Sequence, residues 1–174
     1  MTTLFECAAA HPNLYDTDFY VWTQEQAALL RRVPRGSFAL DIENLAEEIE
    51  SMGRAEISKV SSLLLQVLIH LLKMVVEPDS LSQRHWVSEV VTFQSNAVLA
   101  FTPGMRQRIE LDRIWKMACN GAARQFESAE IPVPVWPAEC PLSLDELLVS
   151  DFDPAPALTR VKDALRSVQR AVRN

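Results

Sequence analysis

Apolar residues recur at helical spacing along most of the chain, and the first two such segments are predicted to be helices. The first helix is expected to begin at Thr17 and to end at the Pro34-Arg35-Gly36 break. Its predicted buried face consists of Phe19, Trp22, Gln26, Leu29 and Val33. The second helix is expected to run from an N-cap at Asp41 to a stop at Gly53. Its apolar residues fall in one narrow arc: Ile42, Leu45, Ile49 and Met52.

The segment from Arg54 to Val76 is the most apolar part of the chain. A helix that is apolar on most of its circumference is expected at the centre of a bundle. The segment Trp86–Ala100 is ambiguous between strand and helix, and we expect a helix because no partner strand is evident. Thr102 and Pro103 have the pattern of an N-cap and a first-turn proline. The helix that follows is expected to bury Leu111, Ile114, Trp115, Ala118, Ala122 and Phe126.

Prolines divide the last third of the chain. Residues 131–141 contain four prolines and are expected to be extended and irregular, anchored by Trp136. Ser143 and Glu146 have the spacing of a capping box and predict a short helix. A final helix is expected over Ala157–Arg173. Its apolar residues form a narrow seam at spacings of three and four: Leu158, Val161, Leu165, Val168 and Val172.

These elements predict an all-α fold, an irregular helical bundle around a central apolar helix, with a proline-rich surface segment and a C-terminal helix. Residues 14–154 are expected to form one domain, followed by an amphipathic basic helix at 155–174. A helix of this length is not stable alone in water, so its seam must pack on something. Its own body and the same helix of a second chain are the two candidates.

Charge and cysteine content narrow the classes of function. The net charge is −6, which disfavours a nucleic-acid binder. Residues 155–174 carry a net charge of +4, so the remainder carries −10. Three scattered cysteines, Cys7, Cys119 and Cys140, fit free thiols in a reducing cytoplasm. Polar residues interrupt the most apolar stretch, Ser61–Val76, so we expect no membrane span.

The second predicted helix is rich in carboxylates: Asp41, Glu43, Glu47, Glu48 and Glu50. Only Glu43, Glu47 and Glu50 converge, and they point away from the expected core. This glutamate ridge is expected to be a solvated face with arginine partners, because charged side chains stay outside. The candidate partners are Arg31, Arg32, Arg35 and Arg54. A ligand or metal site is the alternative.

His70 and His85 are the remaining candidates for chemistry, each able to act as a metal ligand or a general base. Neither has the spacing to acidic residues that di-iron bundles use. A metal site would need Glu47 or Glu50 together with a histidine, which is fewer ligands than the usual three or four. Nucleotide-binding and nucleophile motifs are absent from the sequence, and no cofactor is expected.

The chain resembles the bacterial family called domain of unknown function 29. The similar segments are LYDTDFYVWTQEQAALLR, DIENLAEEIESMGRAE, LIHLLK followed by EP and a tryptophan, and WPAECPLSLDELLVSDFDP. The resemblance covers about Leu14 to Pro154, and the ENLAEEIESMGR block is its most specific part. It implies a small, all-helical, cytoplasmic bacterial protein and implies no activity.

Two functions fit these patterns. The first is a non-catalytic interaction module in the bacterial cytoplasm, with a protein partner or a homodimer formed through the C-terminal helix, and with neither nucleic acid nor membrane as partner. The alternative is a metal-binding or metal-dependent bundle enzyme that uses Glu47 and Glu50 with His70 or His85.

Overall fold

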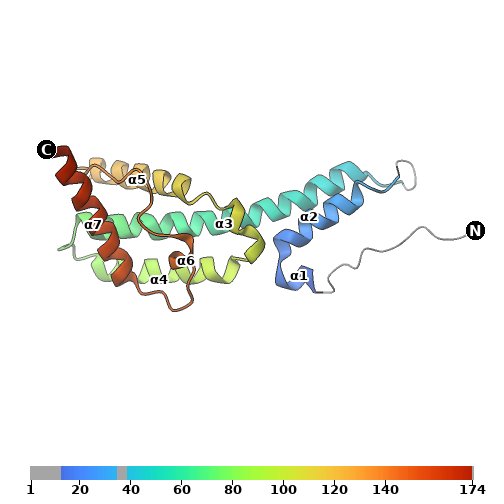
Figure 1. Ribbon diagram of the computed structural model, residues 1–174, viewed down its shortest axis with the longest axis horizontal. Coiled ribbons are helices and arrows are strands. Elements are labelled where there is room, and N and C mark those ends of the chain that lie inside the picture. The colour runs from blue at the N-terminus through green and yellow to red at the C-terminus, as the bar shows by residue number, and fades with distance from the viewer. Residues whose placement is uncertain (1–12, 35–38, 174) are drawn as a thin grey trace, which may run out of the picture. The chain divides into compact units, whose positions relative to one another are not determined.

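The computed structural model describes residues 13–34 and 39–173, and every regular element within these ranges is helical (Figure 1). The predicted all-α fold is confirmed. The elements are α1 (Leu14–Thr17), α2 (Phe19–Leu30), α3 (Ile42–Val76), α4 (Gln83–Ala100), the 3₁₀ helix η1 (Pro103–Arg108), α5 (Leu111–Ser128), α6 (Leu144–Leu147) and α7 (Pro154–Arg173).

The contacts within the chain divide it into two compact units. The predicted domain at 14–154 with a C-terminal helix at 155–174 stays a prediction. The N-terminal unit comprises Met1–Ile57 and Thr102–Arg108, and the C-terminal unit comprises Ser58–Phe101 and Ile109–Asn174. The predicted separate helix at 155–174 belongs to the C-terminal unit. One helix, α3, contributes its first part to the N-terminal unit and its remainder to the C-terminal unit.

The predicted helix stop at Gly53 is wrong, because α3 continues through it to Val76. Gly53 is buried, and a Cβ atom at this position would collide with the Thr23 hydroxyl oxygen on α2. A mid-helix glycine lowers helix stability by only about 1 kcal/mol, which packing offsets. Gly53 therefore allows α2 and α3 to approach closely, and the predicted N-cap holds, since Asp41 accepts a hydrogen bond from the Asn44 amide at 3.3 Å.

The buried face of α2 also differs from the predicted one. Tyr20, Thr23 and Ala27 are buried, whereas Leu29 is exposed and Phe19, Trp22, Gln26 and Val33 are partly exposed. The helix begins at Phe19 instead of Thr17, because the Asp18 carboxylate caps it by accepting the Val21 amide at 3.2 Å. Thr23 and Ala27 lie on the buried face of α2 together with Tyr20, and Phe19, Trp22 and Leu29 form a second stripe beside this face.

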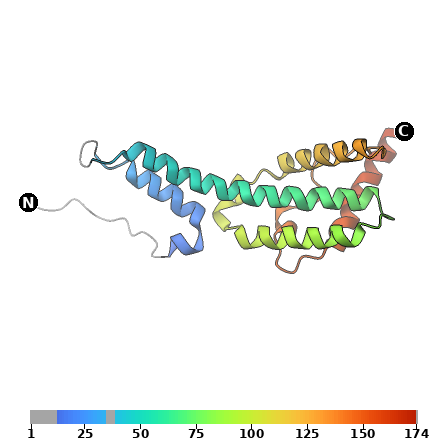
Figure 2. The same cartoon turned by 180° about the vertical axis from the view of Figure 1, so that it is seen from behind.

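In the C-terminal unit, α3 is the central helix, as predicted. It lies between α4 and α5 in both views (Figures 1 and 2). Its most deeply buried side chains are Val60, Leu64, Val67, Leu68, Leu71 and Leu72. The residues predicted to be buried on α5 are buried apart from Leu111, which is partly exposed. Trp115 donates its indole N–H to the Pro137 carbonyl at 2.9 Å, which ties α5 to the proline-rich segment.

The region around Thr102 differs from the prediction. Pro103 opens η1, and the long helix α5 begins only at Leu111. The Thr102 hydroxyl donates to the Asp18 carboxylate at 2.8 Å. The ambiguous segment before it is confirmed as a helix, and α4 begins early enough to include His85 in its first turn, where a loop was expected.

Around α6, polar contacts accompany the fully buried side chain of Leu147. The predicted capping box is present, with the Ser143 hydroxyl accepting the Glu146 amide and Glu146 accepting the Ser143 amide. Residues 131–141 have no regular structure, as predicted. Gln94 on α4 is almost fully buried and donates to the carbonyls of Leu147 and Val149 at 3.1 and 2.8 Å, which fixes α6 against α4.

The seam of α7 is only partly covered by the C-terminal unit. Val161 and Leu165 are buried, Val168 is half-buried, and Val172 is 67% exposed. The first half of the helix therefore packs on the protein's own body, which was one of the two expected arrangements.

By length and composition alone, α3 could cross a membrane, and 44% of its apolar window is buried inside the protein. The core helix of a globular protein passes the same test, so this property assigns no membrane location.

Candidate functional site

The glutamate ridge lies on the part of α3 that belongs to the N-terminal unit, opposite the end of α2. The Arg31 guanidinium bonds Glu50 through both of its terminal nitrogens and Glu43 through Nε at 3.2 Å. Arg54 approaches Glu50 at 3.8 Å. Two of the four arginines predicted as partners are thus present, while Arg35 lies outside the described residues. Glu47 is exposed and has no ion pair within the described part of the chain.

Arg31 stabilises the charged form of Glu50. Its side-chain hydrogen bonds hold the pKa of the Glu50 carboxyl below the usual range, and the same bonds raise the pKa of Arg31. A carboxyl with a lowered pKa is ionised at neutral pH and does not release or take up protons there. The ridge therefore behaves as an ion-paired surface, as the sequence predicts for a solvated face.

The two histidines lie in the C-terminal unit. His70 is half-buried, its Nδ1 lies 2.9 Å from the Gln66 carbonyl, and its ring is 5.7 Å from that of Phe93. Burial is the main cause that lowers the pKa of His70, so the neutral ring is favoured near neutral pH. His85 is exposed on α4. His70 thus has the surroundings of a structural histidine packed against an aromatic ring.

Metal-binding side chains do not cluster in the described ranges, where no three histidine, cysteine or acidic residues converge. Glu47 and Glu50 belong to the N-terminal unit, and His70 and His85 to the C-terminal unit. Burial raises the pKa of the Cys119 thiol to about 12 and that of Cys140 to about 11. Both thiols are protonated at neutral pH, and the protonated form is neither a nucleophile nor a metal ligand. Cys119 is buried and Cys140 is partly buried.

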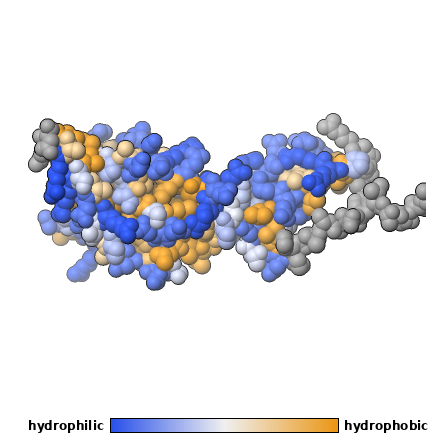
Figure 3. All heavy atoms as spheres, viewed as in Figure 1, coloured by the Kyte–Doolittle hydropathy of each residue, from blue (hydrophilic) through white to orange (hydrophobic). Residues whose placement is uncertain are grey.

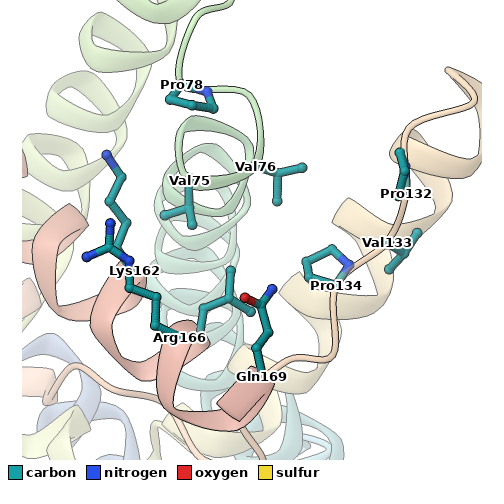
Figure 4. Close-up of a pocket in the computed structure, with 10 residues that line it drawn as sticks. Val75, Val76, Pro78, Pro132, Val133, Pro134, Lys162, Arg166 and Gln169 are labelled. Atoms are coloured by element: carbon teal, nitrogen blue, oxygen red, sulfur yellow. The ribbon is translucent and has the colours of Figure 1, made fainter. Parts of the chain in front are cut away.

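A concave surface in the C-terminal unit was missed by sequence reasoning. It is a groove of about 520 Å³, formed by the end of α3, the proline-rich segment and α7. Figure 4 shows Lys162, Arg166 and Gln169 coming from α7, with Pro132, Val133 and Pro134 opposite them and Val75 and Val76 between. We call it the α7 groove; its lining residues are Val75, Val76, Pro78, Pro132, Val133, Pro134, Lys162, Leu165, Arg166 and Gln169.

The α7 groove combines apolar walls with positive charge. Seven of its ten lining residues are apolar, and the charged ones are Lys162 and Arg166, with no acid among them. Arg166 has a surface contact with Asp163 at 3.5 Å, and Lys162 has no ion pair within the described residues. Figure 3 likewise shows apolar patches framed by hydrophilic residues on the visible face of this unit. The groove can therefore hold a ligand that is apolar on one side and negatively charged on the other.

Three polar residues with structural roles were also missed. Asp18 accepts the Gly104 amide at 2.7 Å in addition to the Thr102 hydroxyl, so its carboxylate joins α2 to η1. Thr23 and Gln94 are buried and hydrogen-bonded. For Asp18, the local signal was its position before an apolar helix, which is the usual place of an N-cap.

The structure so defines a small all-α protein made of two helical units, with an ion-paired acidic surface and a basic-edged apolar groove. The chain belongs to the family described as Domain of unknown function DUF29, whose model matches residues 14–153. The family resemblance seen in the sequence is thereby confirmed.

The chain is also similar to a solved structure. It is the crystal structure of an alpha-helical protein of unknown function from Rhodospirillum rubrum, with 33% sequence identity and a TM-score of 0.78. The match covers 84% of this chain and 96% of that one. No curated protein matches the chain.

Proposed function

We propose that this protein is a non-catalytic helical interaction module of the bacterial cytoplasm, and that its α7 groove holds an acidic, amphipathic segment of a protein partner. The observation that carries the proposal is the groove itself, where apolar walls adjoin two cationic side chains from α7. Neither nucleic acid nor membrane is part of the proposal.

The partial burial of the apolar seam of α7 supports the α7 groove as the binding site. Within its seam, Val161 and Leu165 are buried and Leu158 is partly exposed. After Leu165 the seam becomes progressively exposed, with Val168 half-buried and Val172 at 67%. The apolar surface that begins in the groove therefore continues along the free end of the helix. A helix laid in such a groove would anchor apolar residues at every third or fourth position, a common mode of recognition.

Charge favours an acidic partner over a second copy of the same helix. Residues 155–174 carry a net charge of +4, so pairing two α7 helices would bring like charges together. Like charges facing each other across an interface oppose association, whereas an acidic segment would be attracted. A homodimer through α7 is accordingly the less favoured arrangement of this helix.

Fluorescence anisotropy with two labelled amphipathic peptides tests the proposal. In the acidic probe, leucines at helical spacing alternate with glutamates, and in the matched basic probe lysines replace the glutamates. The full-length protein should bind the acidic probe, and the Lys162→Glu/Arg166→Glu variant should bind it at least about tenfold more weakly, which corresponds to about 1.4 kcal/mol.

The matched control is Lys116→Glu/Arg124→Glu, which makes the same charge change at two exposed positions of α5 outside the groove. Both variants make the protein more negative, which weakens binding of the acidic peptide at long range, and added salt screens this effect. In added salt, the control variant should change the dissociation constant for the acidic peptide by less than about twofold. Equal weakening by both variants, or equal binding of both peptides, would contradict the groove as the site.

The metal-dependent alternative has its own measurement. Metal analysis of the purified protein tests it. A stoichiometric metal that is present in the parent and lost in the Glu47→Gln/Glu50→Gln variant would establish the alternative.

A further inference from the structure

We infer that the hairpin of α2 and the first part of α3 self-associates, through an apolar face that the N-terminal unit leaves uncovered, with a second copy of this chain. The inference concerns a different unit from the α7 groove and is independent of the function proposed for that groove.

The apolar face follows from the order of residues on the two helices. On α2, Phe19 and Trp22 come one residue before the buried Tyr20 and Thr23. The same offset occurs on α3, where Leu45 and Met52 come one residue before the buried Ala46 and Gly53. Successive residues of a helix are rotated by about 100° about its axis. On each of the two helices, the stripe of large apolar residues is therefore rotated away from the buried face by about 100° in the same sense.

The two helices run antiparallel, because Thr23 packs at Gly53 while Arg31, later on α2, pairs with Glu43, earlier on α3. In an antiparallel pair, equal turns of the same sense bring both stripes to one side of the hairpin. On α3, the positions of Glu43 and Glu50 are rotated about the helix axis by about 40–60° from Ala46, in the sense opposite to those of Leu45 and Met52. The Arg31 ion pairs therefore occupy the opposite side, and the hairpin is charged on one side and apolar on the other.

We call this surface the hairpin face and define it by Tyr15, Phe19, Trp22, Leu29, Leu45, Ile49 and Met52. The rings of Tyr15, Phe19 and Trp22 pack on one another with centroids 4.8–5.6 Å apart. Tyr15, Leu29, Leu45 and Met52 expose between 41% and 58% of their surface. The helical periodicity of these apolar residues predicts that they are buried, yet in the described structure each of them is partly or largely exposed.

The unit's own core is too small to use this face internally. Among the described residues of the unit, the buried large apolar side chains are Tyr20 and Met105, and the remaining buried apolar positions on the hairpin are Ala27 and Ala46, with Gly53 between the helices. Two helices cannot enclose a core, whereas four helices packed as two hairpins can, with apolar stripes turned inward.

A second copy fits this face better than a charged partner. The hairpin face contains no charged residue at its centre, because the acids on α3 lie at its edge (Asp41 and Glu48) and at the end of its stripe (Glu56). Placing the face against itself therefore brings apolar residues together and leaves these acids at a polar rim. A two-fold dimer uses the same patch on both subunits, which requires only self-complementarity. At roughly 200 Å² per side chain, the four exposed residues supply on the order of 400 Å², and the partly exposed rings and Ile49 raise this to about 600 Å² at most. That is the size of a small interface, about 600 Å² per partner, which is expected to form a concentration-dependent dimer.

Sedimentation of the full chain over a range of concentrations tests the inference. The protein should sediment as a dimer at high concentration, and Leu45→Arg/Met52→Arg should raise the dimer dissociation constant at least about 100-fold. Leu81→Arg/Leu99→Arg is the matched control, because it makes the same change at two exposed leucines outside the face, and it should leave the dissociation constant within about threefold. The milder Leu45→Ser/Met52→Ser pair should act in the same direction, and circular dichroism checks that each variant keeps its helix content.

Two results would overturn the inference. One is a parent protein that stays monomeric at all concentrations, and the other is a dimer that the hairpin variants and the control variants weaken equally. A monomeric parent whose residues 1–12 must be deleted before it dimerises would assign the face to that segment instead. Peptide binding at the α7 groove should be unchanged in the hairpin variants, so failure of one proposal leaves the other testable.

Discussion

Gly53 illustrates how one absent side chain determines a helix contact. Gly53→Ala should destabilise the protein by about 1–3 kcal/mol through overpacking against Thr23, although alanine favours a helix by about 1 kcal/mol. Urea denaturation followed by circular dichroism measures the change. Gly121→Ala on α5 is the control, because its added Cβ would meet only the tip of Ile69 at 3.3 Å.

The origin of the Gly53 effect can be isolated with a second substitution. Thr23→Ala removes the hydroxyl that the new Cβ would meet, so the two changes should be less damaging together than the sum of their separate effects. A Gly53→Ala variant as stable as the parent would show that α2 and α3 do not need this close approach.

The Asp18 carboxylate joins three donors: the amides of Val21 and Gly104 and the hydroxyl of Thr102. Asp18→Ala should lower the free energy of unfolding by about 2–4 kcal/mol, because it removes an N-cap and leaves three partly buried donors without their acceptor. Urea denaturation gives the value, and Asp16→Ala, at an exposed position two residues earlier, should change it by less than about 0.5 kcal/mol. Equal effects of the two substitutions would refute this role.

Among the helices, α3 contributes most of the apolar core of the C-terminal unit. Leu68 is fully buried on it, and Leu68→Ala should cost about 2–5 kcal/mol through lost burial and the cavity left behind. Leu99→Ala on α4 is the same substitution at a residue that is 85% exposed, and it should be nearly neutral. Chemical denaturation measures the free energy of unfolding of both variants. A similar decrease in both would mean that Leu68 is not buried in the core.

The two ends of α7 should contribute differently to stability. Deleting residues 155–174 removes the buried Ala157, Val161 and Leu165, and should lower the melting temperature by several degrees, at roughly 2–4 °C per kcal/mol. Deleting only residues 170–174, where the described side chains are exposed, should leave it unchanged. Scanning calorimetry of the parent and both truncations makes the comparison, and a full deletion that melts with the parent would show that α7 does not dock.

Considered as a whole, the molecule has a large core in one unit and a small one in the other. We therefore expect hydrogen exchange to divide α3, with amides of residues 42–57 exchanging about tenfold or more faster than those of 58–76 in dilute solution. Exchange measured by mass spectrometry at peptide resolution tests this. Uniform protection along α3 would indicate that the two parts unfold as one.

Much of the C-terminal unit could be predicted from the sequence, and the reason is physical. Leu64, Leu68 and Leu71 recur at helical spacing on a helix that is apolar nearly all round, so their burial does not depend on which neighbour covers them. The capping box at Ser143 is a local device of four residues, and a local pattern identifies it.

The N-terminal unit and the candidate site could not be predicted in the same way. Periodicity finds the most apolar stripe of α2, but Thr23 and Ala27, being small, determine which side approaches α3. Asp18 bonds residues 84 and 86 positions away, and such distant partners leave no mark on neighbouring residues. The α7 groove is formed by three separate segments, and its shape exists only after folding.

The bonds from Asp18 also bear on the order in which the chain is made. Thr102 and Gly104 complete the N-terminal unit, yet the ribosome adds them 84 and 86 residues after Asp18. At about 5–20 residues per second, this interval lasts roughly 4–17 s. The hairpin is complete only after Ile57, 45 residues before Thr102, so it lacks the segment that satisfies its capping carboxylate for roughly the last 2–9 s of this interval. During that time its apolar side chains are available to chaperones or to a neighbouring nascent chain on the same messenger.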